Sequence, residues 1–455
     1  MIRFLLYLAV SVIRVHWNNL RSQKKLYQSA ERRIIRGIQR AYKNVPYYRQ
    51  LYDTHGVTIN DIKTLDDLQK LPFITKDEIR NQFPKGIVSR KFKIDRCHYS
   101  ATTGSTGRSL PFVYNQSAYA FYIATGLRMY TLIGYRPWHK VTYIKYTAIK
   151  YPRFGPFFRT AHIPSTISLE KQIAMLRKTQ PDLLIGYASI ILEIAQKATP
   201  DDLKQIRPKF IGINSELSTK DQRDFISSVF GCPVYDEYST EETWMIASQC
   251  REGNYHLFID NVWVEFLDKN GKTVKPGEEG EMVLTTSRSD AMPFIRYRIG
   301  DIGRYSDKKC PCGLGYPLLE AFEGRADDSF ILPSGKYISS LKILNTFTKF
   351  IKKYLHLMEE FKVIQKDRGH IVIELVKGRE YTDHQFRELI DSLREIFGEP
   401  VTISVEHVDH IAMKNGIKRK AIESWVTDKD HSVSRFSNQE LRQDVKRGCG
   451  GRETG

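Results

Sequence analysis

Residues 100–112, SATTGSTGRSLPF, combine two glycines with a cluster of small hydroxyl side chains. Glycine lets a backbone approach a ligand closely, and amide N–H groups and hydroxyls donate hydrogen bonds, so such a loop suits a phosphate. The loop lacks the G-x-x-x-x-G-K-[ST] pattern of P-loop proteins, because Gly104 and Gly107 lie only three positions apart. These residues alone leave two interpretations open, a phosphate-binding loop or an ordinary surface turn.

Cysteine and histidine side chains form a second group that could do chemistry. Cys310 and Cys312 lie in the turn CPCG, and Cys250 and His256 precede them at six-residue spacing. Zinc prefers thiolate and imidazole ligands, and three cysteines with one histidine complete a closed tetrahedral site. We expect a structural zinc, with Cys250 at the end of a helix and His256 at the start of a β region. The alternative is a set of reduced cysteines and a surface histidine without metal.

Alternating strand-like and helical patterns predict the scaffold that positions these groups. Between about 120 and 250, apolar runs such as KVTYI and DLLIGY alternate with amphipathic helices, which favours an α/β sheet with ligands at the carboxyl ends of its strands. From 255 to 305 the pattern becomes β-rich, with turns at Asn270-Gly271 and Pro276-Gly277. After EGRADD, a small α+β pattern begins.

The predicted domain boundaries follow these changes. An apolar and basic segment covers residues 1–29, and a large α/β domain covers 30–324 with a β-rich subdomain at about 255–320. A small α+β domain covers 325–426. The polar stretch 427–455 is expected to be disordered.

The net charge of the chain indicates which kinds of partner it binds. The 455-residue chain has a net charge of +18, which favours anionic partners such as nucleotides, polyphosphate, acidic membranes or nucleic acid. No recognisable nucleic-acid module accompanies its basic stretches, so we expect no nucleic-acid partner. Six cysteines are too few for a disulfide framework in so long a chain, and no convincing signal peptide precedes them. The expected location is therefore the cytoplasm.

The opening segment has an apolar run from Phe4 to Ile13, bracketed by Arg3 and Arg14, which is too short to span a bilayer. It predicts a helix that is either buried on the domain or lies in a membrane surface beside the basic stretch that follows. We favour the buried helix. Peripheral membrane contact stays open, as does a homodimer.

Nine further blocks follow the glycine-containing loop in order: PDLLIGYAS, GINSEL, YDEYSTEE, NYHLFIDNVWVEF, GEEGEMVLTT, PFIRYRIGDIGRY, CPCG, GRADD and GIKRK. Together they resemble the adenylate-forming superfamily, in particular the phenylacetate–CoA ligase branch that includes capsular-polysaccharide-biosynthesis proteins. The resemblance covers about residues 30 to 425. It implies a large N-terminal domain and a small, mobile C-terminal lid domain, which agrees with the predicted α/β and α+β parts.

The resemblance also implies an activity. A carboxylic acid attacks the α-phosphate of ATP to give an acyl-adenylate and pyrophosphate, and a thiol, usually that of coenzyme A, then displaces AMP. The protein aligns the reactants, neutralises charge with Mg²⁺ and cations, and keeps water from the mixed anhydride. Two alternatives are transfer to an amine or hydroxyl of a sugar or polymer, and a basic scaffold with a degenerate fold.

Site residues carry over by position. The implied loop over the β- and γ-phosphates comprises Thr102, Thr103, Gly104, Ser105, Thr106 and Gly107. Ser215 and Glu216 of GINSEL border the adenine pocket, and Gly186 and Tyr187 lie near the acyl pocket. Thr240 touches the α-phosphate region and Glu241 binds Mg²⁺; if Tyr238 stacks on adenine instead, Glu242 becomes the metal ligand.

The remaining implied residues are Asp301 in the large domain and three residues in the small domain. Asp301, in a charged turn between strands, accepts the ribose hydroxyls. Arg325 reaches the phosphates and Asp327 is the hinge. Lys418 bridges the attacking carboxylate and the nucleotide in the first half-reaction. Some members of the resembled branch also carry a structural zinc held by cysteines and a histidine.

Overall fold

The computed structural model describes residues 2–102, 110–146, 157–325, 329–354, 357–411 and 420–426. They fall into two compact units. The first contains residues 1–132 and 238–322, and the second contains residues 133–237 and 323–428. The chain enters the first unit within β7 (Val234–Thr240) and leaves it within β13 (Leu318–Arg325).

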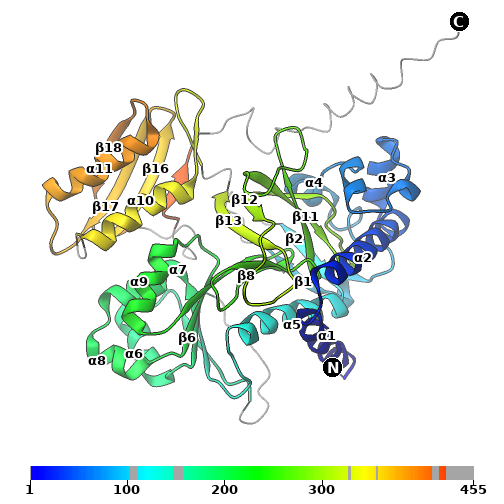
Figure 1. Cartoon of the computed structure of the whole chain (residues 1–455), viewed down its shortest axis with the longest axis horizontal. Helices are drawn as coiled ribbons and strands as arrows, with labels where there is room; N and C mark the ends of the chain where they lie inside the picture. Colours follow the sequence, from blue (N-terminus) through cyan, green and yellow to red (C-terminus); the bar gives the residue numbers. More distant parts are fainter. Residues whose placement is uncertain are drawn as a thin grey trace, which may run out of the picture. The chain divides into compact units, whose positions relative to one another are not determined.

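Helices and antiparallel strands build the first unit (Figure 1). Its helices are α1 (Ile2–Asn19), α2 (Gln23–Asn44), α3 (Pro46–Thr54), α4 (Lys76–Gln82) and α5 (Gln116–Leu132), with short 3₁₀ turns at Ile59–Asp61, Asp66–Lys70 and Ile94–Arg96. Its strands are the hairpin β1 (His98–Ala101) and β2 (Pro111–Tyr114), and β8 (Trp244–Gln249), β9 (Tyr255–Leu257), β10 (Val262–Leu267), β11 (Gly280–Thr286) and β12 (Tyr297–Ser306). With the start of β13, the larger strands follow the order β10-β11-β12-β13-β9-β8. The β-rich pattern predicted from 255 to 305 is confirmed.

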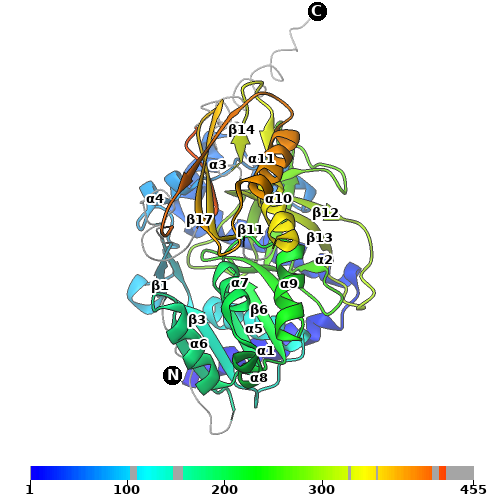
Figure 2. The same ribbon diagram turned by 90° about the vertical axis from the view of Figure 1, so that its left-hand side faces the viewer.

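A five-stranded parallel sheet forms part of the second unit, in the order β7-β6-β5-β3-β4. Its elements are β3 (Val141–Lys145), β4 (Thr160–Pro164), α6 (Leu169–Thr179), β5 (Leu183–Tyr187), α7 (Ala188–Lys197), α8 (Pro200–Ile206), β6 (Phe210–Asn214) and α9 (Lys220–Phe230). Strands β5 and β6 are buried along their whole length, as expected for parallel strands beneath helices (Figure 2). The predicted alternation of strands and helices is confirmed.

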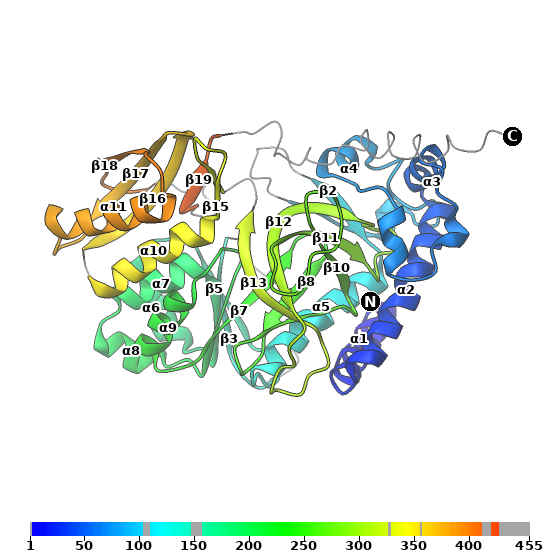
Figure 3. The same cartoon turned by 45° about the horizontal axis from the view of Figure 1, so that its top comes forward.

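A four-stranded sheet in the order β18-β17-β16-β19 forms the rest of the second unit. Helices α10 and α11 pack on it through one shared core (Figure 3). The elements are β14 (Phe330–Ile331), β15 (Tyr337–Ile338), α10 (Ser340–Lys353), β16 (Met358–Asp367), β17 (His370–Lys377), α11 (Asp383–Phe397), β18 (Thr402–His407) and β19 (Ile422–Ser424). This is the predicted small α+β pattern.

Two local predictions are wrong. Cys250 follows strand β8, not a helix, because Trp244–Gln249 pairs with β9 in an antiparallel ladder. Asp301 lies inside strand β12, not in a turn between strands. The register against β11 shifts between Met282 and Val283, and Gly300 has a φ of +81°. This bulge explains why the sequence reads locally as a turn.

Helix α1 packs along α5, but only one of its faces is buried. Val15 and Asn18 are buried, whereas Ile13 and Trp17 are exposed. The preferred expectation of a buried helix therefore holds for the inner face alone. Among the helices that the structure describes, none combines the length and apolar character needed to cross a membrane.

A buried ion pair fixes α1 and α5 to the strand region. Arg128 of α5 donates to Asp260 Oδ2 at 2.8 Å, and Asn18 of α1 donates to the same oxygen at 2.7 Å. Tyr316 Oη donates to Asp260 at 3.2 Å. Burial alone would raise the pKa of Asp260, but the Arg128 charge and these hydrogen bonds hold it below its ordinary value.

Candidate functional site

Tyr238 and Asp301, two residues predicted to bind the nucleotide, contact each other in the first unit. Tyr238 Oη donates to Asp301 Oδ2 at 2.6 Å, and both residues are buried. The Tyr238 ring packs on Phe322 with 4.5 Å between the ring centroids. Strand β12 and the end of β7 thus position a carboxylate beside an aromatic pair, which suits the hydroxyls of a ribose and the face of a base.

The two neighbouring glutamates that follow β7 differ in burial. Glu242 is buried and accepts a hydrogen bond from Tyr297 Oη at 2.8 Å. Glu241 is exposed, and its backbone carbonyl accepts a hydrogen bond from the Tyr114 hydroxyl. A single exposed carboxylate fits Mg²⁺, which keeps several waters and binds one or two carboxylates together with substrate phosphates. Of the two glutamates, Glu241 has the exposure that a Mg²⁺ ligand needs.

The conformation of this segment is fixed by its own polar groups. Thr240 Oγ1 lies 2.9 Å from Thr243 Oγ1 and accepts a hydrogen bond from the Thr243 N–H at 3.1 Å. Asn261 is buried and donates to the carbonyls of Thr243 and Met245 at 2.9 and 2.7 Å. The Thr240 hydroxyl is thus held in place before any ligand binds.

In the second unit, the carboxyl ends of three parallel strands bring Ser215 and Glu216 together with a lysine that the sequence analysis missed. Lys145 ends β3, and its Nζ donates to Ser215 Oγ at 3.1 Å and lies 4.4 Å from the centre of the Tyr187 ring. Glu216 accepts a hydrogen bond from the Ser189 N–H at 2.9 Å, at the start of α7. The signal for Lys145 was its place directly after the predicted strand KVTYI, at the carboxyl end of a parallel strand.

Several predicted residues cannot be placed. Thr103, Gly104, Ser105, Thr106, Gly107, Asp327 and Lys418 lie outside the described residues. Arg325 ends strand β13, and only its backbone is described. Thr102, at the base of the loop, exchanges hydrogen bonds with Leu110. Its N–H donates to the Leu110 carbonyl at 3.0 Å, and its Oγ1 accepts from the Leu110 N–H at 3.1 Å.

The predicted zinc ligands come together in the first unit. The ligand atoms of Cys250, His256, Cys310 and Cys312 all lie within 4.8 Å of one another. Cys250 Sγ is 3.6 Å from Cys310 Sγ, and Cys312 Sγ is 3.2 Å from His256 Nε2. Tetrahedral zinc with its usual bond lengths places such atoms about 3.5–3.8 Å apart. The four side chains therefore fit a zinc ion.

The surroundings of His256 favour a metal at Nε2. Its Nδ1 lies 3.3 Å from the Tyr316 carbonyl, so Nδ1–H can donate there and leave Nε2 as the ligand atom. Burial lowers the pKa of His256 to about 4, so the imidazole is neutral near pH 7. Asn254 also donates to Cys310 Sγ at 3.3 Å.

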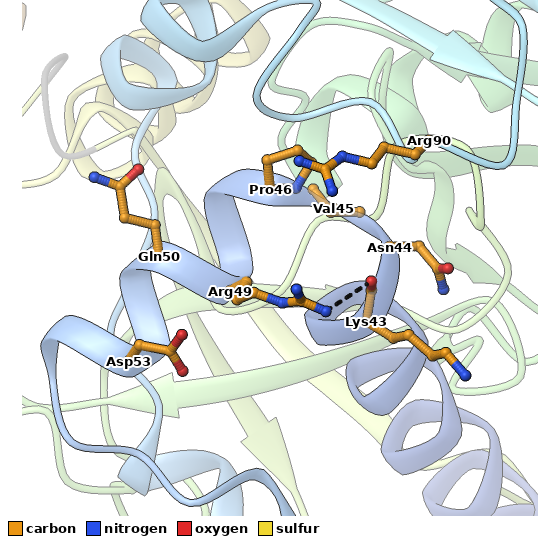
Figure 4. A pocket seen from close by; sticks show the side chains of 8 residues that line it. All are labelled: Lys43, Asn44, Val45, Pro46, Arg49, Gln50, Asp53 and Arg90. Atoms are coloured by element: carbon orange, nitrogen blue, oxygen red, sulfur yellow. Dashed lines mark hydrogen bonds between the residues drawn. The ribbon is translucent and has the colours of Figure 1, made fainter.

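A pocket of about 200 Å³ lies where α2 meets α3 (Figure 4). Its lining includes the cations Lys43, Arg49 and Arg90. The Arg49 guanidinium donates to the carbonyls of Tyr42 and Lys43 at 3.3 and 3.2 Å, in the last turn of α2. This arginine caps a helix end, and none of the predicted site residues lines the pocket.

Comparisons with known proteins identify the fold. 2-Hydroxyisobutyryl-CoA ligase in the postadenylation state has a TM-score of 0.73 and 17% identity, with 94% of each chain covered. Anthranilate CoA ligase in complex with anthranoyl-AMP has a TM-score of 0.54 and 15% identity, over 77% of this chain and 72% of that one. The fold is that of adenylate-forming CoA ligases, as predicted.

Sequence relatives identify the branch. Residues 330–424 match the CapK C-terminal domain. Phenylacetate-coenzyme A ligase of Aromatoleum evansii is 27% identical over 68% of this chain and 73% of that protein. The Escherichia coli K12 enzyme of that name is 25% identical over 81% and 87%. Protein CapK of Staphylococcus aureus is 24% identical over 88% and 90%. The chain is thus related to the phenylacetate–CoA ligase and CapK branch, which confirms the resemblance.

Proposed function

We propose that this protein is an AMP-forming ligase that activates a carboxylic acid with ATP and transfers the acyl group to coenzyme A. The observation that supports the proposal is the hydrogen-bonded Tyr238–Asp301 pair in a chain of this fold, with Asp301 as the carboxylate that would accept the ribose hydroxyls. The same chemistry is named in its relatives, the phenylacetate-coenzyme A ligases. We assign the reaction to the cytoplasm, where thiols stay reduced.

In this proposal the chain's own groups bind and orient the reactants. Asp301 accepts the two ribose hydroxyls, and Tyr238 holds that carboxylate in place. The Thr240 hydroxyl donates to an α-phosphate oxygen, and the loop Thr102 to Gly107 covers the phosphates that leave as pyrophosphate. When bound, Mg²⁺ supplies positive charge to the phosphates. Glu241 would hold it, and Arg325 would add a second cation.

The first half-reaction also needs a cation at the attacking carboxylate. Lys418 has this role in the proposal, and Asp327 is the hinge for the lid domain at 325–426. Ser215 and Glu216 border the adenine. Lys145 lies beside Ser215 and Tyr187, so we add it as a residue that positions the adenine-side loop.

We further propose a structural zinc at Cys250, His256, Cys310 and Cys312. Four protein ligands leave no open position, so the ion would not activate water. It would fix the CPCG turn to strands β8 and β9 just before β13 begins.

The test is carboxylate-dependent exchange of labelled pyrophosphate into ATP, run over a panel of aryl, fatty and amino acids. An acid that supports exchange is expected, and Asp301→Ala should abolish most of it. AMP release on addition of coenzyme A then identifies the acceptor. Failure of every acid would contradict the proposal and favour a scaffold.

The similarity to CapK over 88% of the chain favours one second candidate. In that candidate, the adenylate is formed in the same way, and an amine or hydroxyl of a sugar or polymer in capsular polysaccharide biosynthesis attacks it. Exchange that proceeds normally, with no AMP release on addition of coenzyme A, would favour this acceptor.

A further inference from the structure

Helix α1 presents an apolar stripe on the face opposite its packed side. The stripe recurs at spacings of four and three residues, which places its members on one side of a helix. Its members, with their exposed fractions, are Leu6 (63%), Val10 (44%), Ile13 (71%) and Trp17 (66%) on the helix and Leu20 (82%) in the turn directly after it. We call these five residues the outer stripe.

The outer stripe is unusual for a helix at a protein surface. The inner face of α1 already supplies its packing against α5, through residues such as Val15. Single exposed apolar residues are common, but a contiguous row along a helix marks an interaction surface. Within the described parts of the chain, nothing buries this row, which leaves it available to a partner.

The charges around the outer stripe select the kind of partner. Residues 1–30 contain five basic side chains and no aspartate or glutamate, and the first acidic residue is Glu31. The basic side chains are Arg3, Arg14, Arg21, Lys24 and Lys25. Two copies of this face would bring like charges together, whereas an anionic surface would attract them. Trp17 is also the residue type that prefers the boundary between apolar and polar phases.

A second observation points to phosphate oxygens. Arg33 of α2 has a buried Nη1, and Arg288 after β11 has a buried Nε and Nη2; these three atoms lack a hydrogen-bond partner among the described residues. The Arg288 guanidinium stacks 4.0 Å from the centre of the Phe121 ring. Burial, with the charges of Arg33 and Arg14 nearby, lowers the pKa of Arg288 to about 9.

The carboxylate whose charge acts on both arginines, Asp260, already has other partners. Asp260 accepts hydrogen bonds from Arg128, Asn18 and Tyr316. Buried guanidinium nitrogens without an acceptor are costly, so these three atoms of the partly buried Arg33 and Arg288 favour oxygens from a ligand. A phosphate group supplies several at once.

We propose that the outer stripe of α1 lies in the surface of a membrane that contains anionic lipids, and that Arg33 and Arg288 bind a lipid phosphate beside it. The helix would lie in the plane of the interface with its apolar side chains among the acyl chains. Neither part depends on the acid or acceptor of the proposed ligase, so pyrophosphate exchange in solution reports separately on that function.

Flotation of the full chain with lipid vesicles tests the proposal. We expect binding to vesicles of phosphatidylcholine mixed with phosphatidylglycerol, weaker binding at high salt, and little binding to phosphatidylcholine alone. Ile13→Ser should weaken binding at least about tenfold because it removes apolar area from the interface. Trp17→Ser should do the same, whereas the matched control Trp138→Ser, at an exposed tryptophan outside α1, should bind like the parent.

A second set of variants tests whether Arg33 and Arg288 bind a lipid phosphate. Arg288→Gln and Arg33→Gln should reduce the preference for phosphatidylglycerol severalfold, whereas Arg32→Gln, at the exposed neighbouring position on α2, should reduce it much less. Circular dichroism and unchanged pyrophosphate exchange verify that each variant is folded.

Three results would overturn the proposal. One is no binding to either kind of vesicle. A second is a dimer in solution that Ile13→Ser converts to a monomer, with vesicle binding absent, because the stripe would then be a contact between copies. The third is stabilisation of the parent, but not of Arg288→Gln, by inorganic phosphate without vesicle binding. The arginines would then hold a free phosphate.

Discussion

The Asp301 carboxylate accepts a hydrogen bond from the Tyr238 hydroxyl. In the proposed reaction it also accepts hydrogen bonds from the ribose hydroxyls. Its contribution should therefore appear in binding of every nucleotide that carries a ribose. Glu241 and Glu242 also differ in their surroundings, since Glu241 is exposed and Glu242 accepts a hydrogen bond from Tyr297. Single side chains thus give separable experiments.

Asp301→Ala should weaken ATP binding by about a hundred-fold or more, since it removes two charged hydrogen bonds that are worth about 1.5–3 kcal/mol each. Tyr238→Phe removes one partner of the carboxylate and should have a smaller effect in the same direction. Titration calorimetry measures both. Asp307→Ala, at an exposed position on the same segment, serves as the control. Unchanged ATP affinity in Asp301→Ala would remove this residue from the site.

Glu241→Gln should raise the Mg²⁺ concentration needed for half-maximal exchange about tenfold or more, because a charged ligand is lost. Glu242→Gln should leave that concentration close to the parental value and instead lower the melting temperature, because a buried hydrogen-bonded group is altered. Mg²⁺ titration of the exchange rate separates the two. The reverse pattern would make Glu242 the metal ligand.

Elements of the first unit are joined by polar groups that lie far apart in the sequence. Asp260 connects α1, α5 and the segment after β9, and the cysteine–histidine cluster connects β8, β9 and the CPCG turn. Such groups are costly when one partner is missing, so their removal should act on whole elements.

Arg128→Met leaves Asp260 buried without its main counter-charge and should destabilise the protein by about 3–5 kcal/mol. Lys220→Met, in an exposed pair with Asp224 on α9, should cost at most about 0.5 kcal/mol. Denaturant unfolding measures both variants. Equal effects would mean that the Arg128 pair has no special role.

The effect of Arg128→Met on stability should depend on pH. In the parent, the pKa of Asp260 is lowered, so its stabilising contribution is present above about pH 4, the unfolded value, and is lost as the pH falls further. In Arg128→Met, burial without the counter-charge should raise that pKa, so the variant gains relative stability as the pH falls. The difference in melting temperature between parent and variant should therefore shrink in acid. A constant difference would contradict this assignment.

Zinc removal should loosen the CPCG turn. Elemental analysis of protein purified without a histidine tag is expected to find about one zinc per chain, and Cys310→Ser and Cys312→Ser should lower both zinc content and melting temperature. Cys232→Ser, a buried thiol outside the cluster, is the control for loss of a cysteine. Metal-free protein of full stability, or cluster variants that melt like the parent, would reject the site.

For the whole molecule, the central expectation is that Lys418 of the lid domain serves the first half-reaction and not the second. Lys418→Ala should depress adenylation by about 10²–10³, because one positioned charge is lost, and should spare transfer from a preformed acyl-adenylate. Lys353→Ala, at an exposed lysine of α10, should leave both steps intact. Separate single-turnover assays measure each step, and an equal loss in both would contradict the assignment of Lys418 to the first.

The sequence by itself determined the fold class, the order of strands and helices, and the four side chains of the proposed zinc site. Hydrophobic periodicity and short motifs encode the elements, because each depends on residues close together in the chain, whereas the zinc ligands were chosen by residue type from two separate short segments. It also gave the family resemblance that the relatives confirm. It could not separate Glu241 from Glu242, since adjacent residues on a strand end differ only in which side of the chain they face.

Only the tertiary structure decided the contacts between distant segments. The bulge that places Asp301 inside β12 is set by its register with β11, and Lys145 meets Ser215 because parallel strands end at one edge of a sheet. In the sequence, Leu6, Val10 and Ile13 of the outer stripe belong to one apolar run, Phe4 to Ile13. Which side packs on α5, and which is left for another partner, depends on how the helix docks, and local sequence does not specify docking.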